Sequence, residues 1–270
     1  MNYGCYQDSR FLLVATPSGI TLSPEGGAHQ SINTPLIGMS QPGLTYYEPA
    51  TADELDVILS WALKHMQAPQ GQGGSVYLRL STRPLEQPTR EMTADLREAV
   101  ENGAYWHSPP SHAGSEAPNV CLVFCGCVLP EAVEAQRLLI ESHGLKVALL
   151  QVTSPDRLFK SNQGGKDAVR ELLKDLPTSV PIVTVHDGHP AALSWLGGVR
   201  GHAVRSLGVS AFGQSGDLVD LYKHFGIDAA NIAKTALDAV SSVGAPVKAK
   251  ASKAKSSKAK SSKSSKASKE

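Results

Sequence analysis

Short apolar segments alternate with amphipathic segments along most of the chain. Strands are predicted where apolar residues run together or alternate with polar ones, at Phe11–Ala15, Leu44–Glu48, Ser75–Leu80, Asn119–Phe124, Lys146–Val152, Pro181–Val185 and His202–Leu207. Helices are predicted where apolar residues recur every three or four positions, at 52–66, Ala94–Glu101, Glu131–His143, Ala168–Lys174, Ala191–Leu196, Asp217–His224 and Asp228–Val240. Strands that alternate with helices predict an α/β fold with a mostly parallel sheet.

Local signals refine this pattern and divide the chain. Thr51 and Glu54 have the spacing of a capping box at the start of the first long helix. The polar, proline-bearing segment 85–95 resembles a connector in composition. We therefore expect two α/β domains, at 1–88 and 89–242, joined near this segment.

The C-terminal segment 243–270 is built from lysine, serine and alanine in near repeats and is expected to be disordered. From Lys248 onward it carries nine lysines against one glutamate. This leaves 17 of the 26 basic and 24 of the 25 acidic side chains on the rest of the chain, a net charge of −7. Because the tail has no aromatic side chain for stacking on bases, we expect no specific nucleic-acid partner.

The cysteines and two neighbouring histidines are candidate metal ligands. Cys121, Cys125 and Cys127 lie within seven residues, too close for a disulfide framework, and zinc would need a fourth ligand. His186 and His189 could form a metal pair, but their place before a proline is more typical of a turn. We expect buried thiols, no metal site and a reducing cytoplasm. The sequence shows neither a membrane-spanning apolar segment nor a secretory signal at its start.

The strongest candidate for chemistry is the glycine-rich loop 18–30, which follows the first predicted strand. It presents Glu25 and His29, the two side chains in the loop that are able to transfer protons. The alternative is that His29 is an ordinary solvated loop histidine. Spacing alone does not decide between these interpretations.

Several segments together resemble the transketolase superfamily of thiamine diphosphate enzymes. Residues 25–30, Glu-Gly-Gly-Ala-His-Gln, are similar to the histidine loop of that family. Residues 44–50, Leu-Thr-Tyr-Tyr-Glu-Pro-Ala, resemble its next strand-to-helix junction, and the segments 204–208, 212–215 and 221–228 resemble the end of its third domain. The resemblance implies part of a pyrimidine-binding α/β domain followed by a transketolase-type C-terminal α/β domain.

Two features are similar to the homodimeric pyruvate dehydrogenase branch, Gln7–Leu12 and Gln151–Ser154, whereas residues 221–227 are closer to transketolase. The resemblance implies thiamine diphosphate and Mg²⁺ as cofactors, held between two subunits. It implies that His29 contacts the substrate carbonyl or hydroxyl and shuttles a proton, with Glu25 as a second catalytic candidate. Arg83 would bind substrate, although an ion-pair arginine is an equal alternative.

The chain also departs from the family pattern. We expect it to start too late for the catalytic glutamate of the family and to lie outside the diphosphate-binding domain. The resulting hypothesis is the C-terminal section of a 2-oxo acid (pyruvate) dehydrogenase that passes the acyl group to a lipoyl-bearing partner. A complementary chain would supply the rest of the site, so the isolated chain is expected to be inactive.

Two alternatives remain open. One is a transketolase section, which moves ketol units between sugar phosphates. Such substrates need a basic cluster, and only Arg79 and Arg83 are available near the loop. The other alternative is a non-catalytic assembly module that forms a homodimer.

Overall fold

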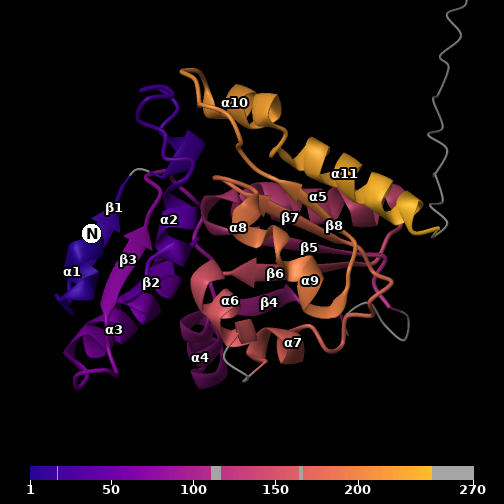
Figure 1. Ribbon diagram of the computed structural model, residues 1–270. Helices are drawn as coiled ribbons and strands as arrows, with labels where there is room; N and C mark the ends of the chain where they lie inside the picture. Colours follow the sequence, from indigo (N-terminus) through magenta and orange to yellow (C-terminus); the bar gives the residue numbers. More distant parts are fainter. Residues whose placement is uncertain (17, 111–116, 164–166, 245–270) are drawn as a thin grey trace, which may run out of the picture.

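The computed structural model describes residues 1–16, 18–110, 117–163 and 167–244. These residues form two units that lie side by side, each built on its own β-sheet (Figure 1). Nearly all of the predicted disordered tail, 243–270, lies outside the described residues. None of the helices in the described part of the chain is long and apolar enough to cross a bilayer.

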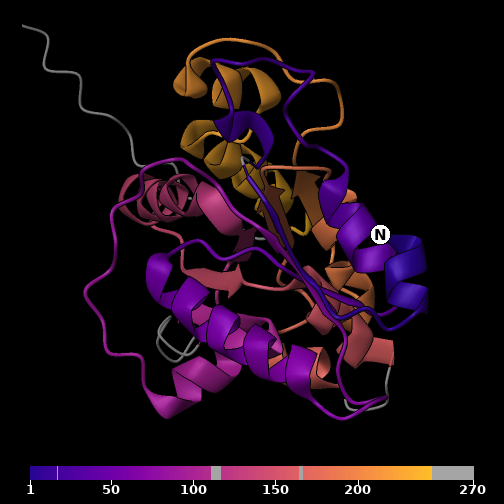
Figure 2. The ribbon, with the colours of Figure 1, turned by 90° about the vertical axis from the view of Figure 1, so that its left-hand side faces the viewer.

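The first unit contains a three-stranded, fully parallel sheet in the order β1-β3-β2. Its strands are β1 (Leu12–Ala15), β2 (Leu44–Tyr47) and β3 (Ser75–Arg79). Its helices are α1 (Asn2–Tyr6), α2 (Thr34–Ser40) and α3 (Ala52–Gln67), with a short 3₁₀ turn, η1 (Gly19–Thr21), after β1. Helix α3 covers one face of the sheet, as Figure 2 shows from the side of this unit, and α1 and α2 cover the other.

The second unit contains a five-stranded sheet in the order β4-β6-β5-β7-β8, parallel except for β4. Its strands are β4 (Ala104–Ser108), β5 (Val120–Cys125), β6 (Val147–Val152), β7 (Ile182–His186) and β8 (Val204–Leu207). Its helices are α4 (Ala94–Asn102), α5 (Leu129–His143), α6 (Pro155–Gln163), α7 (Ala168–Leu172), α8 (Ala191–Ser194), α9 (Leu196–Arg200), α10 (Leu218–Phe225) and α11 (Ala229–Ser242). Helices α5 and α11 cover one face of this sheet and α6 to α9 the other, and both faces are apolar.

The predicted mixed α/β fold with mostly parallel sheets is confirmed, and each predicted strand is present. The segment 104–108 was not predicted as a strand, because it lies at a sheet edge and its second half is partly exposed. The short helices α2 and α6 were also not predicted. The predicted division between residues 88 and 89 remains a prediction.

The start of α3 differs from the predicted capping box. The Thr51 hydroxyl does not accept a hydrogen bond from the helix N-terminus but donates to the Asp53 carboxylate. Asp53 accepts the Glu54 backbone N–H at 2.9 Å, and the Glu54 carboxylate accepts the N–H of Ala50 at 2.8 Å. Asp53 and Glu54 therefore accept the backbone N–H groups at the start of α3, and the Thr51 hydroxyl does not.

Parallel strands of both sheets end at the junction between the two units. Glu48 follows β2, Arg79 ends β3, Cys125 ends β5 and His186 ends β7. In open α/β sheets, the space outside the carboxyl ends of the strands is where ligands usually bind. In this protein, side chains from the two sheets meet there directly.

Candidate functional site

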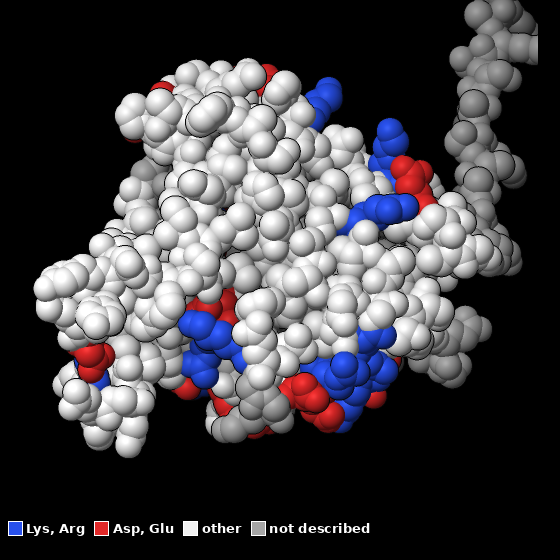
Figure 3. All heavy atoms as spheres, in the orientation of Figure 1, with Lys and Arg blue, Asp and Glu red and all other residues white. Residues whose placement is uncertain are grey.

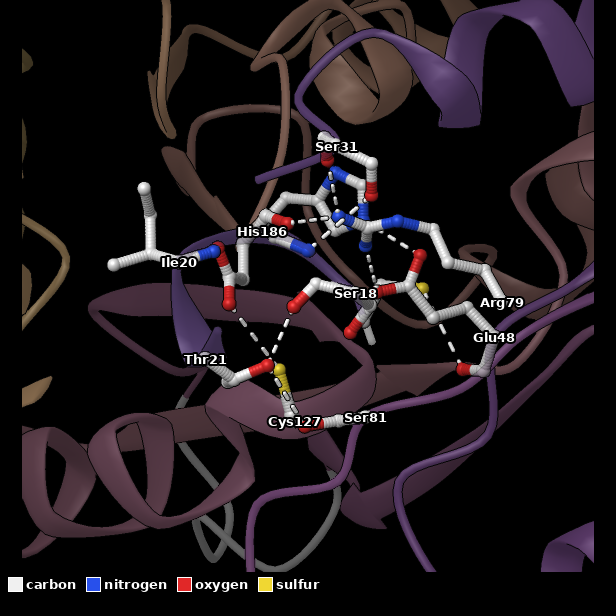
Figure 4. Close-up of polar contacts among 12 residues, drawn as sticks. Ser18, Ile20, Thr21, Ser31, Glu48, Arg79, Ser81, Cys127 and His186 are labelled. Carbon is white, nitrogen blue, oxygen red and sulfur yellow. Dashed lines mark hydrogen bonds and ion pairs between the residues drawn. The ribbon is translucent and has the colours of Figure 1, made fainter. Parts of the chain in front are cut away.

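The junction is a buried polar cluster centred on Arg79 and Glu48 (Figure 4). The Arg79 guanidinium donates to the Glu48 carboxylate at 2.5 Å, and Nε2 of His186 lies 3.0 Å from the second Glu48 oxygen. The Tyr46 hydroxyl also donates to this second oxygen. Arg79, Glu48 and His186 are at most 2 % exposed, so the whole cluster is shielded from water.

Burial and neighbouring charges shift the pKa of Glu48 in opposite directions. Burial alone would favour the neutral carboxyl, but the positive charge of Arg79, with further contributions from His186 and Tyr46, holds the pKa of Glu48 below its usual value. Glu48 is therefore an anion at neutral pH. A buried charge of this kind is tolerated only while its partners stay in place.

Arg79 also fastens two loops to the cluster. Its guanidinium donates to the backbone carbonyl of Ser31 at 2.8 Å and to that of Asp187 at 2.6 Å. Ser31 belongs to the loop that carries His29, and Asp187 follows β7 of the second unit. One arginine thus joins the first sheet, the histidine loop and the second sheet.

The cluster does not have the properties of a metal site. Ligand atoms of Glu48, Cys125 and His186 lie within 4.8 Å of one another. However, the Glu48 oxygens already accept hydrogen bonds, and the guanidinium of Arg79 would repel a cation. Burial and the charge of Glu48 raise the pKa of the Cys125 thiol, which disfavours the thiolate needed by a metal.

His186 and His189 lie in different surroundings, although they are close in sequence. His186 is buried against Glu48, whereas Nδ1 of His189 accepts the backbone N–H of Ala191 at 3.2 Å at the start of α8. The interpretation of His189 as a turn and helix-start residue agrees with this contact. The predicted buried thiols are confirmed for Cys121, Cys125 and Cys127.

The histidine loop is held against the second unit by hydrogen bonds. The N–H of Ile20 donates to the buried Asp187 carboxylate at 2.8 Å. The Gln30 amide donates to the carbonyls of Leu22 at 3.1 Å and Gln214 at 2.9 Å. These bonds attach the loop at both ends, so His29 is carried on a fixed segment.

The glycines of the loop allow its backbone to approach the segment 212–216 closely. A Cβ atom on Gly27 would lie 1.9 Å from the carbonyl oxygen of Gly213, well inside van der Waals contact. Gly26 has φ +91°, a left-handed conformation that favours glycine, and its Cβ would lie 2.4 Å from Oγ of Ser215. The glycine-rich composition is thus needed for docking the loop.

His29 is exposed at a groove of about 550 Å³ between the histidine loop and the second unit. The groove is lined by Gly27, Ala28, His29, Gln30, Ser31, Ile32, Asn33, His189, Ser210, Ala211 and Phe212. The lining residues include imidazole, hydroxyl and amide side chains. Glu25 is exposed and is not among these lining residues, and its catalytic role remains a prediction.

Arg83 is engaged in an ion pair between the two units. Its guanidinium forms two hydrogen bonds with the Glu131 carboxylate, at 2.7 and 2.9 Å, and donates to the carbonyl of Cys127 at 3.0 Å. It also lies over the ring of Tyr222, 5.2 Å from the ring centre. Arg83 does not line the His29 groove, and its substrate-binding role remains a prediction.

The cluster of Glu48, Cys125 and His186 does not fit the diphosphate end of thiamine diphosphate. A diphosphate bound with Mg²⁺ needs accessible oxygen ligands for the metal. The grouped metal-ligating side chains of the described chain, Glu48, Cys125 and His186, are buried and already bonded to one another or to Arg79. No step of the chemistry is therefore assigned to a cofactor on this chain alone.

The sequence pattern did not identify the cluster of Arg79, Glu48 and His186 as a unit. The signal available was a charged or polar residue at the carboxyl end of each of three predicted strands. Arg79 had been considered for a basic substrate cluster, but it is completely buried and bonded to Glu48. It cannot contact a substrate in this arrangement.

Comparisons with known proteins bear on this geometry. Residues 103–228 match the family model of the transketolase-like TK C-terminal domain. The chain is similar to the pyruvate dehydrogenase E1 component of Escherichia coli K12, with 27% identity over 254 residues, 89% of this chain and 28% of the relative. It is also similar to that of Mycolicibacterium smegmatis, with 28% identity over 176 residues, 64% of this chain and 18% of the relative.

Solved structures with a similar fold include transketolases. Transketolase from Leishmania mexicana superposes with a TM-score of 0.67 and 21% identity, covering 87% of this chain and 32% of the other. A structure described as a split gene transketolase, inactive beta4 tetramer, gives a TM-score of 0.61 and 18% identity, covering 85% of this chain and 67% of the other. The chain spans less than a third of the length of the pyruvate dehydrogenase relatives described above.

Proposed function

We propose that this chain is the C-terminal section of a thiamine diphosphate-dependent 2-oxo acid dehydrogenase. Residues 103–228 match the family model of the transketolase-like TK C-terminal domain, and the fold is similar to that of transketolases. The enzyme would decarboxylate a 2-oxo acid of the pyruvate type and pass the acyl group to a lipoyl-bearing partner. A complementary chain would hold the cofactor diphosphate with Mg²⁺ and supply the catalytic glutamate. The assembled enzyme would work in the cytoplasm.

The observation that carries this proposal is the placement of His29. It is exposed at a groove between the two units, on a loop whose backbone is bonded to the buried Arg79 and Asp187. A histidine fixed in this way can donate a proton to a substrate oxygen, or accept one from it, without a change of the loop. The alignment with pyruvate dehydrogenase E1 components over 89% of the chain supports the choice of substrate class.

The two arginines considered for sugar phosphates also support a 2-oxo acid. Arg79 is completely buried against Glu48, and Arg83 is paired with Glu131. Neither offers its guanidinium to the His29 groove. A ketol transfer between sugar phosphates would therefore need its basic side chains from elsewhere, which makes the transketolase section the weaker alternative.

The open edge of the first sheet supports the need for a complementary chain. Parallel sheets are normally covered on both faces and continued at their edges. Strand β1 lies at the end of the sheet, and its apolar side chains Leu13 and Val14 are 38% and 49% exposed. These neighbours point to opposite faces, so both faces are uncovered at this edge.

A non-catalytic assembly module is the second candidate. The observation that favours it is the similarity to the split gene transketolase chain described as an inactive tetramer. If this chain also formed an inactive assembly of identical subunits, it would be a stable homo-oligomer in which the His29 groove has no catalytic role.

The test is co-purification of the tagged chain from its source, followed by an assay of pyruvate decarboxylation. A partner with a diphosphate-binding domain and activity of the complex would support the enzyme, whereas a homo-oligomer without a partner would support the module. In the active complex, His29→Ala should lower kcat by about 10²–10⁴-fold. His224→Ala, an exposed histidine of α10, is the matched control and should leave kcat unchanged.

Calorimetric titration of the isolated chain with thiamine diphosphate and Mg²⁺ tests whether a second chain is needed to bind the cofactor. We expect no binding or weak binding, because the cluster of Glu48, Cys125 and His186 does not fit the diphosphate end. Micromolar affinity of the isolated chain would contradict the need for a complementary chain.

A further inference from the structure

A second cleft lies on the opposite side of the interdomain junction from the histidine loop, beside α6, and has a volume of about 460 Å³. Figure 3 shows small groups of Lys and Arg atoms on one face of the molecule, with Asp and Glu atoms directly beside them. The cleft is lined by Thr45, Trp61, His65, Arg157, Lys160 and Ser161. The first three belong to the first unit and the last three to α6 of the second, so the cleft spans both units.

Arg157 supplies a positive charge that has no carboxylate within ion-pair distance in the described part of the chain. Its hydrogen bonds go to neutral groups, the Tyr47 hydroxyl at 3.0 Å and the Asn102 side-chain oxygen at 3.3 Å. It also lies over the ring of Trp61 at 4.7 Å. These contacts fix the guanidinium in place and leave N–H donors for a ligand.

Lys160 adds a second cation beside it. Its ammonium donates to the Leu44 carbonyl and to the Asp156 carboxylate, both at 2.9 Å, and the side chain is 47% exposed. Asp156 is the acidic group that faces the cleft cations, and it is completely buried beneath Lys160. Asp156 interacts mainly with Lys160 and more weakly with Arg157. Two cations thus face one carboxylate, and the cleft keeps a net positive charge.

His65 and Thr45 complete a lining of donors. The ring of His65 stacks on Trp61, with ring centres 4.5 Å apart, and neither His65 nor the Thr45 hydroxyl has a side-chain hydrogen bond within the described part of the chain. Burial lowers the pKa of His65, and the charges of Arg157, Arg10 and Lys160 lower it further. The lowered pKa of His65 is therefore due in part to the positive charges around it.

We propose that this cleft binds a tetrahedral oxyanion, either inorganic phosphate or the phosphate group of a small ester, between Arg157, Lys160, His65 and Thr45. Convergent N–H and O–H donors next to a guanidinium without an ion-pair partner are the chemistry that recognises such oxygens. A metal cation would be repelled. A nucleobase would have no stacking surface, because Arg157 and His65 already contact the Trp61 ring.

Binding at this position would fasten the two units together. Thr45 and His65 stand on the first unit and Arg157 and Lys160 on the second, so one anion would bridge them. A ligand that binds only this arrangement stabilises it by mass action. The inference does not depend on the proposed enzymatic function, since the cleft is separate from the His29 groove.

The test is a titration of the full chain with sodium phosphate at neutral pH, with sodium chloride added to keep the ionic strength constant. We expect a saturable change in tryptophan fluorescence, because Trp61 lies under Arg157, and a rise in the melting temperature. A parallel titration with glycerol phosphate separates the two sources. Binding of both would assign the site to phosphate esters as well, and binding of inorganic phosphate alone would limit it to the free ion.

Variants locate the site. Arg157→Met keeps the aliphatic contact with Trp61 but removes the charge, and should weaken phosphate binding at least tenfold. Arg137→Met removes one exposed arginine on α5 and should leave binding unchanged. Should Arg157→Met fail to fold, Thr45→Val, which removes one hydroxyl from a strand position, should weaken binding several-fold. An absence of saturable binding, or equal loss in Arg157→Met and Arg137→Met, would overturn the proposal.

Discussion

Replacing Arg79 by methionine should destabilise the protein more than any change of a surface charge. The substitution keeps an unbranched side chain of similar length but removes the guanidinium that pairs with Glu48 at 2.5 Å. Glu48, only 2 % exposed, would then be a buried carboxylate without its main partner. Breaking a buried ion pair by removing one member typically costs about 3–5 kcal/mol.

Two further bonds would be lost in the same variant. The carbonyls of Ser31 and Asp187 would lose their donor, at about 0.5–1.5 kcal/mol each. Because Ser31 belongs to the histidine loop, the loop should also become more accessible to protease. Arg79→Met is therefore expected to lower the urea midpoint and to speed cleavage within residues 18–33.

The assay is urea unfolding followed by circular dichroism and by tryptophan fluorescence, since two units can unfold in separate steps. Glu48→Gln and the double variant complete a cycle, and we expect the double variant to be less destabilised than the sum by about 1–3 kcal/mol. Arg137→Met serves as the exposed control, with no change of midpoint expected. Additive effects, or a loss below about 1 kcal/mol for Arg79→Met, would refute the role given to the cluster.

Three other predictions follow from the same contacts. Folding lowers the pKa of Glu48, so the ionised carboxylate stabilises the folded protein at pH above its unfolded pKa of about 4.5. This stabilisation is lost as the pH falls through the pKa of the folded state. In Glu48→Gln, the urea midpoint of unfolding should therefore depend less on pH in the acid range. Gly27→Ala should displace the histidine loop from Gly213 and increase its proteolysis, whereas unchanged cleavage would contradict the close approach. A thiol reagent should modify Cys5 in the native protein and all four cysteines in denaturant; fast native labelling of more than one thiol would argue against the buried placement of the other three.

Much of the fold could be predicted from local pattern. The segment Val120–Cys125 is apolar throughout and forms a strand that is buried along its whole length. The edge strand Ala104–Ser108 was not predicted, because an edge position leaves part of the strand exposed and weakens the apolar signal. Local pattern thus found the apolar strands, including the edge strands β1, β2 and β8, and missed β4, whose second half is partly exposed.

For the site, the sequence singled out the loop and its histidine. Glycine content, the preceding strand and the resemblance to the histidine loop together indicated His29, and the structure places it at a groove. The sequence could not indicate that the loop is bonded to Asp187 and Gln214, which are more than 150 residues away in the chain. Contacts of this range depend on how the two sheets are docked.

Arg79 shows which features follow from the sequence and which depend on the tertiary structure. The sequence by itself determined that Arg79 and Glu48 lie near the carboxyl ends of two strands, predicted at Ser75–Leu80 and Leu44–Glu48. Only the tertiary structure decided that they pair, since the parallel register of β2 and β3 sets Tyr47 beside Leu78 and brings the next two residues together. Docking of the second sheet then excludes water and adds His186. From the sequence, Arg79 was a candidate for substrate binding. In the structure it is buried by the docked sheets and holds the histidine loop through the Ser31 carbonyl.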